Sequence, residues 1–100
     1  MSEVRSLLER LAEKQPGPLP TFTAIQILSV ILYLGEVGVA GRKKISKALG
    51  IGEGAVRNIL NRLRAAGLLE TVRQGCRLSR GGLRLYRRLS RTLVKLGSLN

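Results

Sequence analysis

The 100-residue sequence predicts a mainly α-helical domain that carries one small β-hairpin. Three observations lead to this prediction. Apolar residues recur at intervals of three and four along most of the chain, which is the spacing of one helix face. Glycines and prolines divide these stretches into separate helices. Two short strand-like runs, residues 68–73 and 76–79, are joined by a two-residue turn, Gln74-Gly75.

The first twenty residues are expected to form a helix and a connector. In residues 1–15, Val4, Leu7, Leu8 and Leu11 fall on one face of an amphipathic helix. Residues 16–20 contain three prolines, which cannot continue a helix, so we predict a stiff, extended connector. We expect the domain core to span residues 21–80 and a C-terminal basic helix to span residues 81–100.

Residues 24–34 form the most apolar run of the chain and are predicted to be a helix buried on most sides. Eleven residues rise about 16 Å as a helix, which is roughly half the hydrocarbon thickness of a membrane. We therefore do not expect this run to span a bilayer. Thr21 or Thr23 can cap its start, and Gly35 lies near its expected end.

Two shorter helices are expected next. The first is basic, begins near residue 42 and is closed by Gly50. After the Ile51-Gly52 turn, a second helix covers residues 53–66, and Gly67 supplies the left-handed residue that ends it. The inward face of this second helix is apolar: Val56, Ile59, Leu60 and Leu63.

A final helix is predicted over roughly residues 80–96, where Ser79 is in position to cap its start. One stripe of this helix is apolar: Leu85, Tyr86, Leu89, Leu93 and Leu96. Another face is basic: Arg84, Arg88, Arg91 and Lys95. The final helix is therefore amphipathic as well as strongly cationic.

The charge of the chain is large and unevenly placed. Eighteen Lys and Arg residues against six acidic ones give a net charge of +12. Residues 1–40 carry three basic and four acidic side chains, whereas residues 41–100 carry fifteen basic and two acidic ones. Such an excess indicates a polyanionic partner that meets the C-terminal sixty residues.

Several residue types are absent or rare, and this argues against an enzyme. The chain has no His and no Asp, so the usual bases and metal ligands are missing, and we expect no cofactor, metal or small-molecule ligand. The single cysteine, Cys76, cannot form an internal disulfide and fits the reduced cytoplasm. We interpret it as a small apolar strand residue rather than a redox sensor. No signal peptide is apparent at the N-terminus.

Two helices joined by a short turn and followed at once by a hairpin follow the order of a winged helix-turn-helix. In that arrangement the second helix enters the major groove of duplex DNA. For this helix we predict contacts from Glu53, Gly54, Arg57, Asn58, Asn61 and Arg62. Phosphate contacts are predicted from Arg42, Lys43, Lys44, Lys47 and Arg64, and wing contacts from Arg73, Gln74 and Arg77. The alternative for the helix side chains is an ordinary solvated face.

Residues 45–70, ISKALGIGEGAVRNILNRLRAAGLLE, resemble the core of winged helix-turn-helix transcriptional regulators. The hairpin and the LSRGG segment extend the resemblance to about residue 96, and GPLPTFTAIQIL is similar to small archaeal members of this class. The resemblance implies sequence-specific binding of duplex DNA. The chain departs from metal-sensing repressors of this superfamily, which bind their ions partly with His and Asp.

We also predict a homodimer, because the first and last helices each carry a leucine stripe. The predicted dimer contacts are Val4, Leu7, Leu8, Leu11, Leu85, Leu89, Leu93 and Leu96. Packing of these residues within one chain is the alternative. Two other functions stay open: a protein-interaction module of a transcription or replication assembly, and an RNA-binding domain.

Overall fold

The computed structural model describes residues 21–98. It contains four helices and one hairpin, which confirms the predicted fold class: α2 (Thr21–Val37), α3 (Arg42–Leu49), α4 (Glu53–Ala65), β1 (Leu69–Val72), β2 (Gly75–Leu78) and α5 (Arg80–Ser98). The predicted helix over 1–15 and the connector over 16–20 lie outside the described residues.

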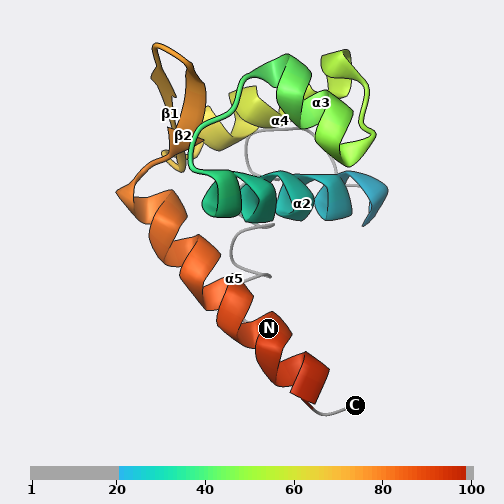
Figure 1. The fold of residues 1–100 in the computed structure, drawn as a ribbon, viewed down its shortest axis with the longest axis vertical. Helices are drawn as coiled ribbons and strands as arrows, with labels where there is room; N and C mark the ends of the chain where they lie inside the picture. Colours follow the sequence, from blue (N-terminus) through green and yellow to red (C-terminus); the bar gives the residue numbers. More distant parts are fainter. Residues whose placement is uncertain (1–20, 99–100) are drawn as a thin grey trace.

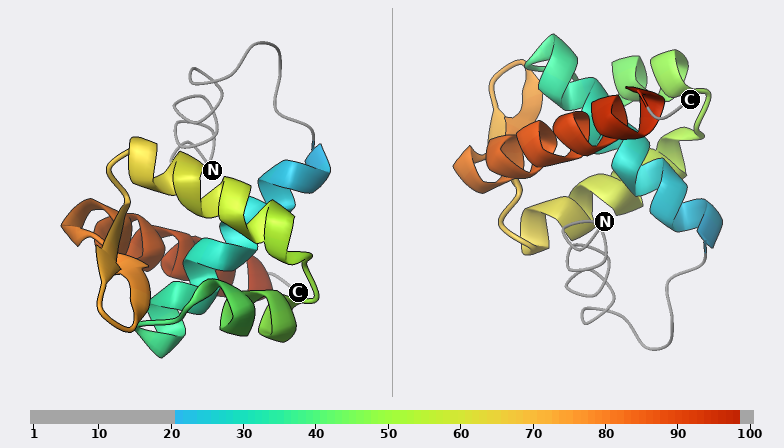
Figure 2. Two further views of the ribbon diagram at one scale, coloured as in Figure 1. Left: turned by 90° about the horizontal axis from the view of Figure 1, so that it is seen from above. Right: turned by 90° about the horizontal axis from the view of Figure 1, so that it is seen from below.

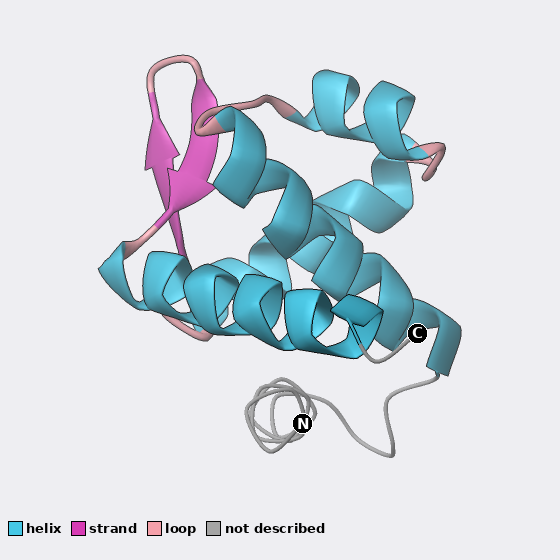
Figure 3. Cartoon of the chain, turned by 60° about the horizontal axis from the view of Figure 1, so that its bottom comes forward, coloured by secondary structure: helices cyan, strands magenta, loops and turns pink. Residues whose placement is uncertain are grey.

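The helix α2 lies at the centre of the fold and separates two parts of it. Helices α3 and α4 lie on one side of α2, and α5 crosses on the other side and runs away from the hairpin (Figure 1). The hairpin stands at one edge, where β1 contacts α4 and β2 contacts both α2 and α5 (Figure 3). This arrangement leaves α3, α4 and the hairpin together on one face.

The helix α2 is longer than the sequence predicts. It runs through Gly35 to Val37 and is followed by Gly38, whose φ of +88° and N–H bond to the Leu34 carbonyl (2.9 Å) end the helix. Its most deeply buried residues follow the helical period and form the centre of the core: Ile27, Val30, Ile31 and Leu34. The prediction of a helix buried on most sides is confirmed for this face only, because Ile25 is 55% exposed. The expected end of the helix was three residues short.

The turn between α3 and α4 is set by local hydrogen bonds. Gly50 has φ +67° and ψ 30°, and the amides of Gly50 and Ile51 both donate to the Ser46 carbonyl. The Ser46 hydroxyl donates in return to the Ile51 carbonyl. Gly52 precedes α4 and offers no side-chain cap. The predicted boundaries of this turn are thus confirmed.

The end of α4 also agrees with its glycine signal. Gly67 has φ +76°, and the following amide, that of Leu68, donates back to the Leu63 carbonyl at 2.9 Å. This is the bond expected where a left-handed glycine closes a helix. Because the bond turns the chain sharply, β1 starts directly beside α4.

The hairpin differs from its prediction at the turn. Val72 pairs with Gly75, so the two turn residues are Arg73 and Gln74, and Gly75 is the first residue of β2. Gly75 has φ +139°, and a Cβ there would lie 2.6 Å from the Ala40 carbonyl oxygen. Ala40 forms a β-bridge with Cys76 through two backbone bonds of 3.0 and 3.1 Å. The segment before α3 therefore joins the two-stranded hairpin through an isolated β-bridge, which the sequence does not predict.

The start of α5 is capped by Ser79, as predicted. Its hydroxyl accepts a bond from the Gly82 amide at 3.1 Å and donates to the Gly67 carbonyl at 2.7 Å. One side chain thus caps α5 and connects it to the end of α4. The helix extends to Ser98, two residues beyond the predicted end.

Candidate nucleic-acid interface

The helix α4 divides into a buried apolar face and an exposed polar face. Val56, Ile59, Leu60 and Leu63 lie in the core, as predicted. Arg57, Asn58 and Asn61 are exposed. Gly54 lies on the same exposed face by the helical period, and a Cβ there would meet no atom within 4 Å. The exposed face therefore combines hydrogen-bonding side chains with a position where the backbone itself is accessible.

Asn61 is oriented by a neighbour on α4. Arg64 Nη1 donates a hydrogen bond to Asn61 Oδ1 at 3.0 Å. Because a guanidinium contains only donors, the Asn61 atom that faces it is the amide oxygen, and the Asn61 amide nitrogen is left to donate elsewhere. Arg64, for which the sequence predicts a phosphate contact, thus also positions Asn61.

Glu53 is paired across the helix-turn-helix. Its Oε1 lies 3.6 Å from Nε of Arg42, at the start of α3, and the two side chains are 48% and 40% exposed. An exposed pair of this kind contributes little to stability. Its effect is electrostatic, because each partner offsets the other's charge at the surface predicted to face phosphates.

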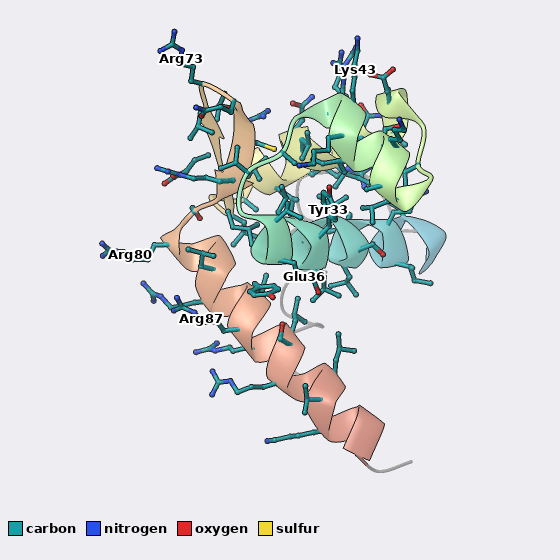
Figure 4. The ribbon with its side chains drawn as sticks, viewed as in Figure 1. Tyr33, Glu36, Lys43, Arg73, Arg80 and Arg87 are labelled. Carbon is teal, nitrogen blue, oxygen red and sulfur yellow. The ribbon has the colours of Figure 1, made fainter. Side chains whose placement is uncertain are left out.

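The basic residues of α3 and the hairpin tip project to the same side of the molecule. Lys43, Lys44 and Lys47 are exposed on α3, as are Arg73 and Gln74 at the hairpin turn. Lys43 and Arg73 point in the same general direction (Figure 4). Seen from that side, α3, α4 and the hairpin lie next to one another in front of α2 and α5 (Figure 2, left). We call this side the helix-turn-helix face.

Two predicted contact residues lie differently from the others. Arg77 lies toward the base of the hairpin, not at its tip, because the register pairs it with Glu70. Its Nε is 3.0 Å from Glu70 Oε2, and α5 residues Arg80 and Arg84 lie nearby in the same groove. Arg62 is half-buried, whereas Arg57 is exposed. Arg57 is therefore more accessible than Arg62.

The leucine stripe predicted for the dimer is divided by the fold. Leu89 is 4% exposed and packs in the core of its own chain, and Leu85 is packed against the same core. These contacts explain why Leu89 has little surface left for a partner. Leu93 is 50% exposed. Side-chain placement of Leu96, and of Val4, Leu7, Leu8 and Leu11, lies outside what the structure describes.

Cys76 is buried in β2, where its thiol donates to the Ala40 carbonyl at 3.2 Å. Burial raises the pKa of this thiol above 9.0, and the positive charge of Arg64 only partly opposes this rise. The thiol is therefore protonated at neutral pH and makes a poor nucleophile. This supports the interpretation of Cys76 as a packed strand residue.

A helix-turn-helix followed by a hairpin that bridges to the segment before α3 is consistent with a helix-rich, winged-helix-like domain. A family model for the N-terminal domain of PH0730-like proteins, an archaeal-type family, matches residues 25–84. The chain belongs to this family. Comparison with curated proteins and with solved structures gave no match. Among residues 21–98, no helix has both the length and the apolar character needed to cross a membrane.

Proposed function

We propose that this protein binds duplex DNA sequence-specifically and regulates transcription, with α4 as its recognition helix. The observation that carries the proposal is the exposed polar face of α4. The helix α4 lies on the same side of the molecule as α3 and the hairpin (Figure 2, left). A major groove about 12 Å wide accepts a helix, and its base edges offer the acceptors and donors that such side chains recognise.

The proposed roles follow from exposure and reach. Arg57, Asn58 and Asn61 read base edges, since they are exposed on the outer surface of α4. The α3 lysines and Arg64 contact phosphates, which orients the domain without reading sequence. Arg73 and Gln74 at the hairpin tip reach the adjacent backbone or minor groove. For Glu53, which the sequence predicts as a further contact of the recognition helix, the pair with Arg42 supports a second role, which is to offset the charge of that arginine.

The electrostatics of this face support the proposal. Residues 21–98 contain three carboxylates, Glu36, Glu53 and Glu70. Glu53 is paired with Arg42, and Glu70 is paired with Arg77. Glu36 lies on the α5 side of α2 (Figure 4). Little negative charge therefore opposes a phosphate backbone on the helix-turn-helix face.

We further propose a homodimer that binds an inverted repeat. A two-fold dimer would place two recognition helices about one DNA turn apart, near 34 Å. The exposed Leu93 and Val94 at the far end of α5 are the described apolar residues best placed to serve it, since Leu89 is buried within its own chain. The leucines of residues 1–15 are the second predicted element of this contact.

DNA binding is tested in a competition binding assay. A labelled duplex pool is incubated with the protein, and unlabelled duplex, single strands and double-stranded RNA compete for it. Selection of bound fragments from random duplex DNA then defines the preferred site. Preferential competition by RNA would favour the RNA-binding alternative, and the absence of any nucleic-acid binding would favour a protein-interaction module.

A further inference from the structure

The helix α5 carries a second cationic surface that the proposed DNA contacts do not use. Arg80, Arg84, Arg87 and Arg91 are spaced by four, three and four residues and so follow one face of the helix. Arg88 and Lys95 flank this row, and all six side chains are exposed. The row from Arg80 to Arg91 spans about 16 Å along the helix axis. We call these six residues the α5 arginine stripe.

The stripe has almost no negative charge beside it. The helix α5 contains no Asp or Glu. Among the residues that the structure describes, Arg84, Arg87 and Arg91 make no ion pair. Four cations concentrated on one face without carboxylates repel one another, and a bound polyanion would relieve this repulsion.

A shallow groove extends the stripe toward the hairpin. It is lined by Arg77 of β2 and by Arg80, Arg84 and Arg87 of α5, together with the apolar Leu78 and Leu83. The one carboxylate in the groove, Glu70, is bonded to Arg77. The cationic surface therefore begins at the base of the hairpin and follows α5 away from it.

The direction of the stripe separates it from the helix-turn-helix face. Lys43 and Arg73 project toward one side of the molecule, whereas Arg80 and Arg87 project sideways from α5 (Figure 4). The helix itself leads away from the helix-turn-helix face (Figure 1). A straight duplex seated on α3, α4 and the hairpin tip would leave the α5 stripe uncovered.

We propose that the α5 arginine stripe binds the phosphate backbone of a second duplex DNA segment, so that the protein bridges two segments. A row of guanidinium groups repeated every helical turn suits a repetitive ligand such as a phosphate backbone, which guanidinium groups bind in a bidentate manner. A membrane surface fits less well, because Tyr86 and Leu89 pack the middle of the apolar face within the chain, and the exposed Leu83 is separated from Leu93 and Val94. The choice of duplex DNA as the partner rests on the proposed function. The α5 stripe as a second binding site goes beyond that function.

The experiment compares two triple variants with the same loss of charge. Arg84→Gln/Arg87→Gln/Arg91→Gln changes the stripe, and Lys43→Gln/Lys44→Gln/Lys47→Gln changes the helix-turn-helix face. One mixed-sequence 30-base-pair duplex is immobilised, the protein is added, and capture of a second, fluorescent duplex is measured at low salt. Circular dichroism and thermal unfolding check that each variant keeps the fold.

Wild-type protein should capture the second duplex. Each triple variant should still bind one duplex but capture the second at least tenfold less. If the stripe variant captures as well as wild type, bridging runs through two helix-turn-helix faces, and the α5 proposal fails while DNA binding stands. The stripe could instead contact the far end of one duplex that bends around the protein. In that case the stripe variant would bind this single duplex more weakly while the number of duplexes bound per protein stays the same, and the second-segment proposal would also fail. If the stripe variant no longer binds a single duplex while the Lys43/Lys44/Lys47 variant still does, α5 is the main DNA-binding surface. Both the proposal of α4 as recognition helix and the proposal of a second-duplex site on α5 then fail.

Discussion

The ring of Tyr86 on α5 lies directly against Gly35 on α2, at the point where the two helices cross. A Cβ on Gly35 would occupy the position of the ring carbons. This contact explains why a glycine is found within α2, where the sequence alone suggested the end of the helix. It also sets how closely α5 approaches the rest of the fold.

Gly35→Ala is therefore expected to destabilise the protein. Replacing glycine in a helix interior ordinarily adds about 0.5–1 kcal/mol of stability, but overpacking at a close contact costs about 1–3 kcal/mol. We expect a net loss in the free energy of unfolding, measured by urea denaturation. Gly54→Ala is the control, since a Cβ there meets open space and should stabilise α4. A gain of stability for both variants would show that α5 does not pack on Gly35.

Local signals in the sequence predict the helix-turn-helix well. Gly50 and Gly67 end α3 and α4 in left-handed conformations, and Ser79 caps α5. Each of these features depends on residues within a few positions of one another, or on the conformational freedom of glycine. The polar face of α4 is equally visible in the sequence, because the helical period alone separates it from the core.

Features that depend on distant contacts could not be predicted in the same way. The hairpin turn falls at Arg73-Gln74 because β2 pairs with Ala40, which lies 36 residues before Cys76. The division of the α5 leucines into a buried Leu89 and an exposed Leu93 depends on where α5 crosses α2. The spacing of the α5 arginines was a local signal that pointed to the stripe, but its direction relative to α4 required the structure.

Glu53→Gln should increase the affinity for duplex DNA. The change removes a negative charge from the helix-turn-helix face and releases Arg42 for a phosphate contact. We expect binding several-fold tighter at low salt, and a slope of log affinity against log salt that is steeper by about one. Fluorescence anisotropy at several salt concentrations measures both quantities. Glu36→Gln is the matched control, because Glu36 is exposed on the α5 side of α2, away from the helix-turn-helix face (Figure 4). An equal effect of the two variants would contradict the assigned binding face.

Cys76 should be unreactive in the folded protein and should make stability depend on alkaline pH. Its folded pKa is raised, so the stabilising contribution is complete below 9.0 and is lost as pH rises through the folded value. The unfolding free energy of wild type should fall relative to Cys76→Ser by up to about 1.4 kcal/mol per pH unit above pH 9. Thiol labelling at pH 7 should be slow until urea unfolds the chain. If the difference in unfolding free energy between wild type and Cys76→Ser stays constant from pH 8 to 10.5, or if the folded protein is labelled rapidly, the Cys76 thiol is not buried as described.

Deletion of residues 1–15 should convert the proposed dimer to a monomer with weaker DNA binding. The reason is the apolar stripe predicted for this segment, whose exposure costs about 25 cal/mol per Å². Light scattering at tens of micromolar should give twice the 10.9 kDa chain mass for the full chain. Leu93→Glu, at the exposed end of α5, should have the same effect without truncation. A full-length protein that scatters as a monomer would refute the dimer.

The central claim, that α4 reads base edges, is tested most directly by comparing selected with random duplex DNA. Arg57→Ala and Asn61→Ala should each weaken binding to the selected site by about 1–3 kcal/mol and change random binding much less. Lys44→Ala should weaken both alike, since a phosphate contact carries no sequence information. Equal losses on selected and random DNA for all three variants would contradict the assignment of α4 as the recognition helix.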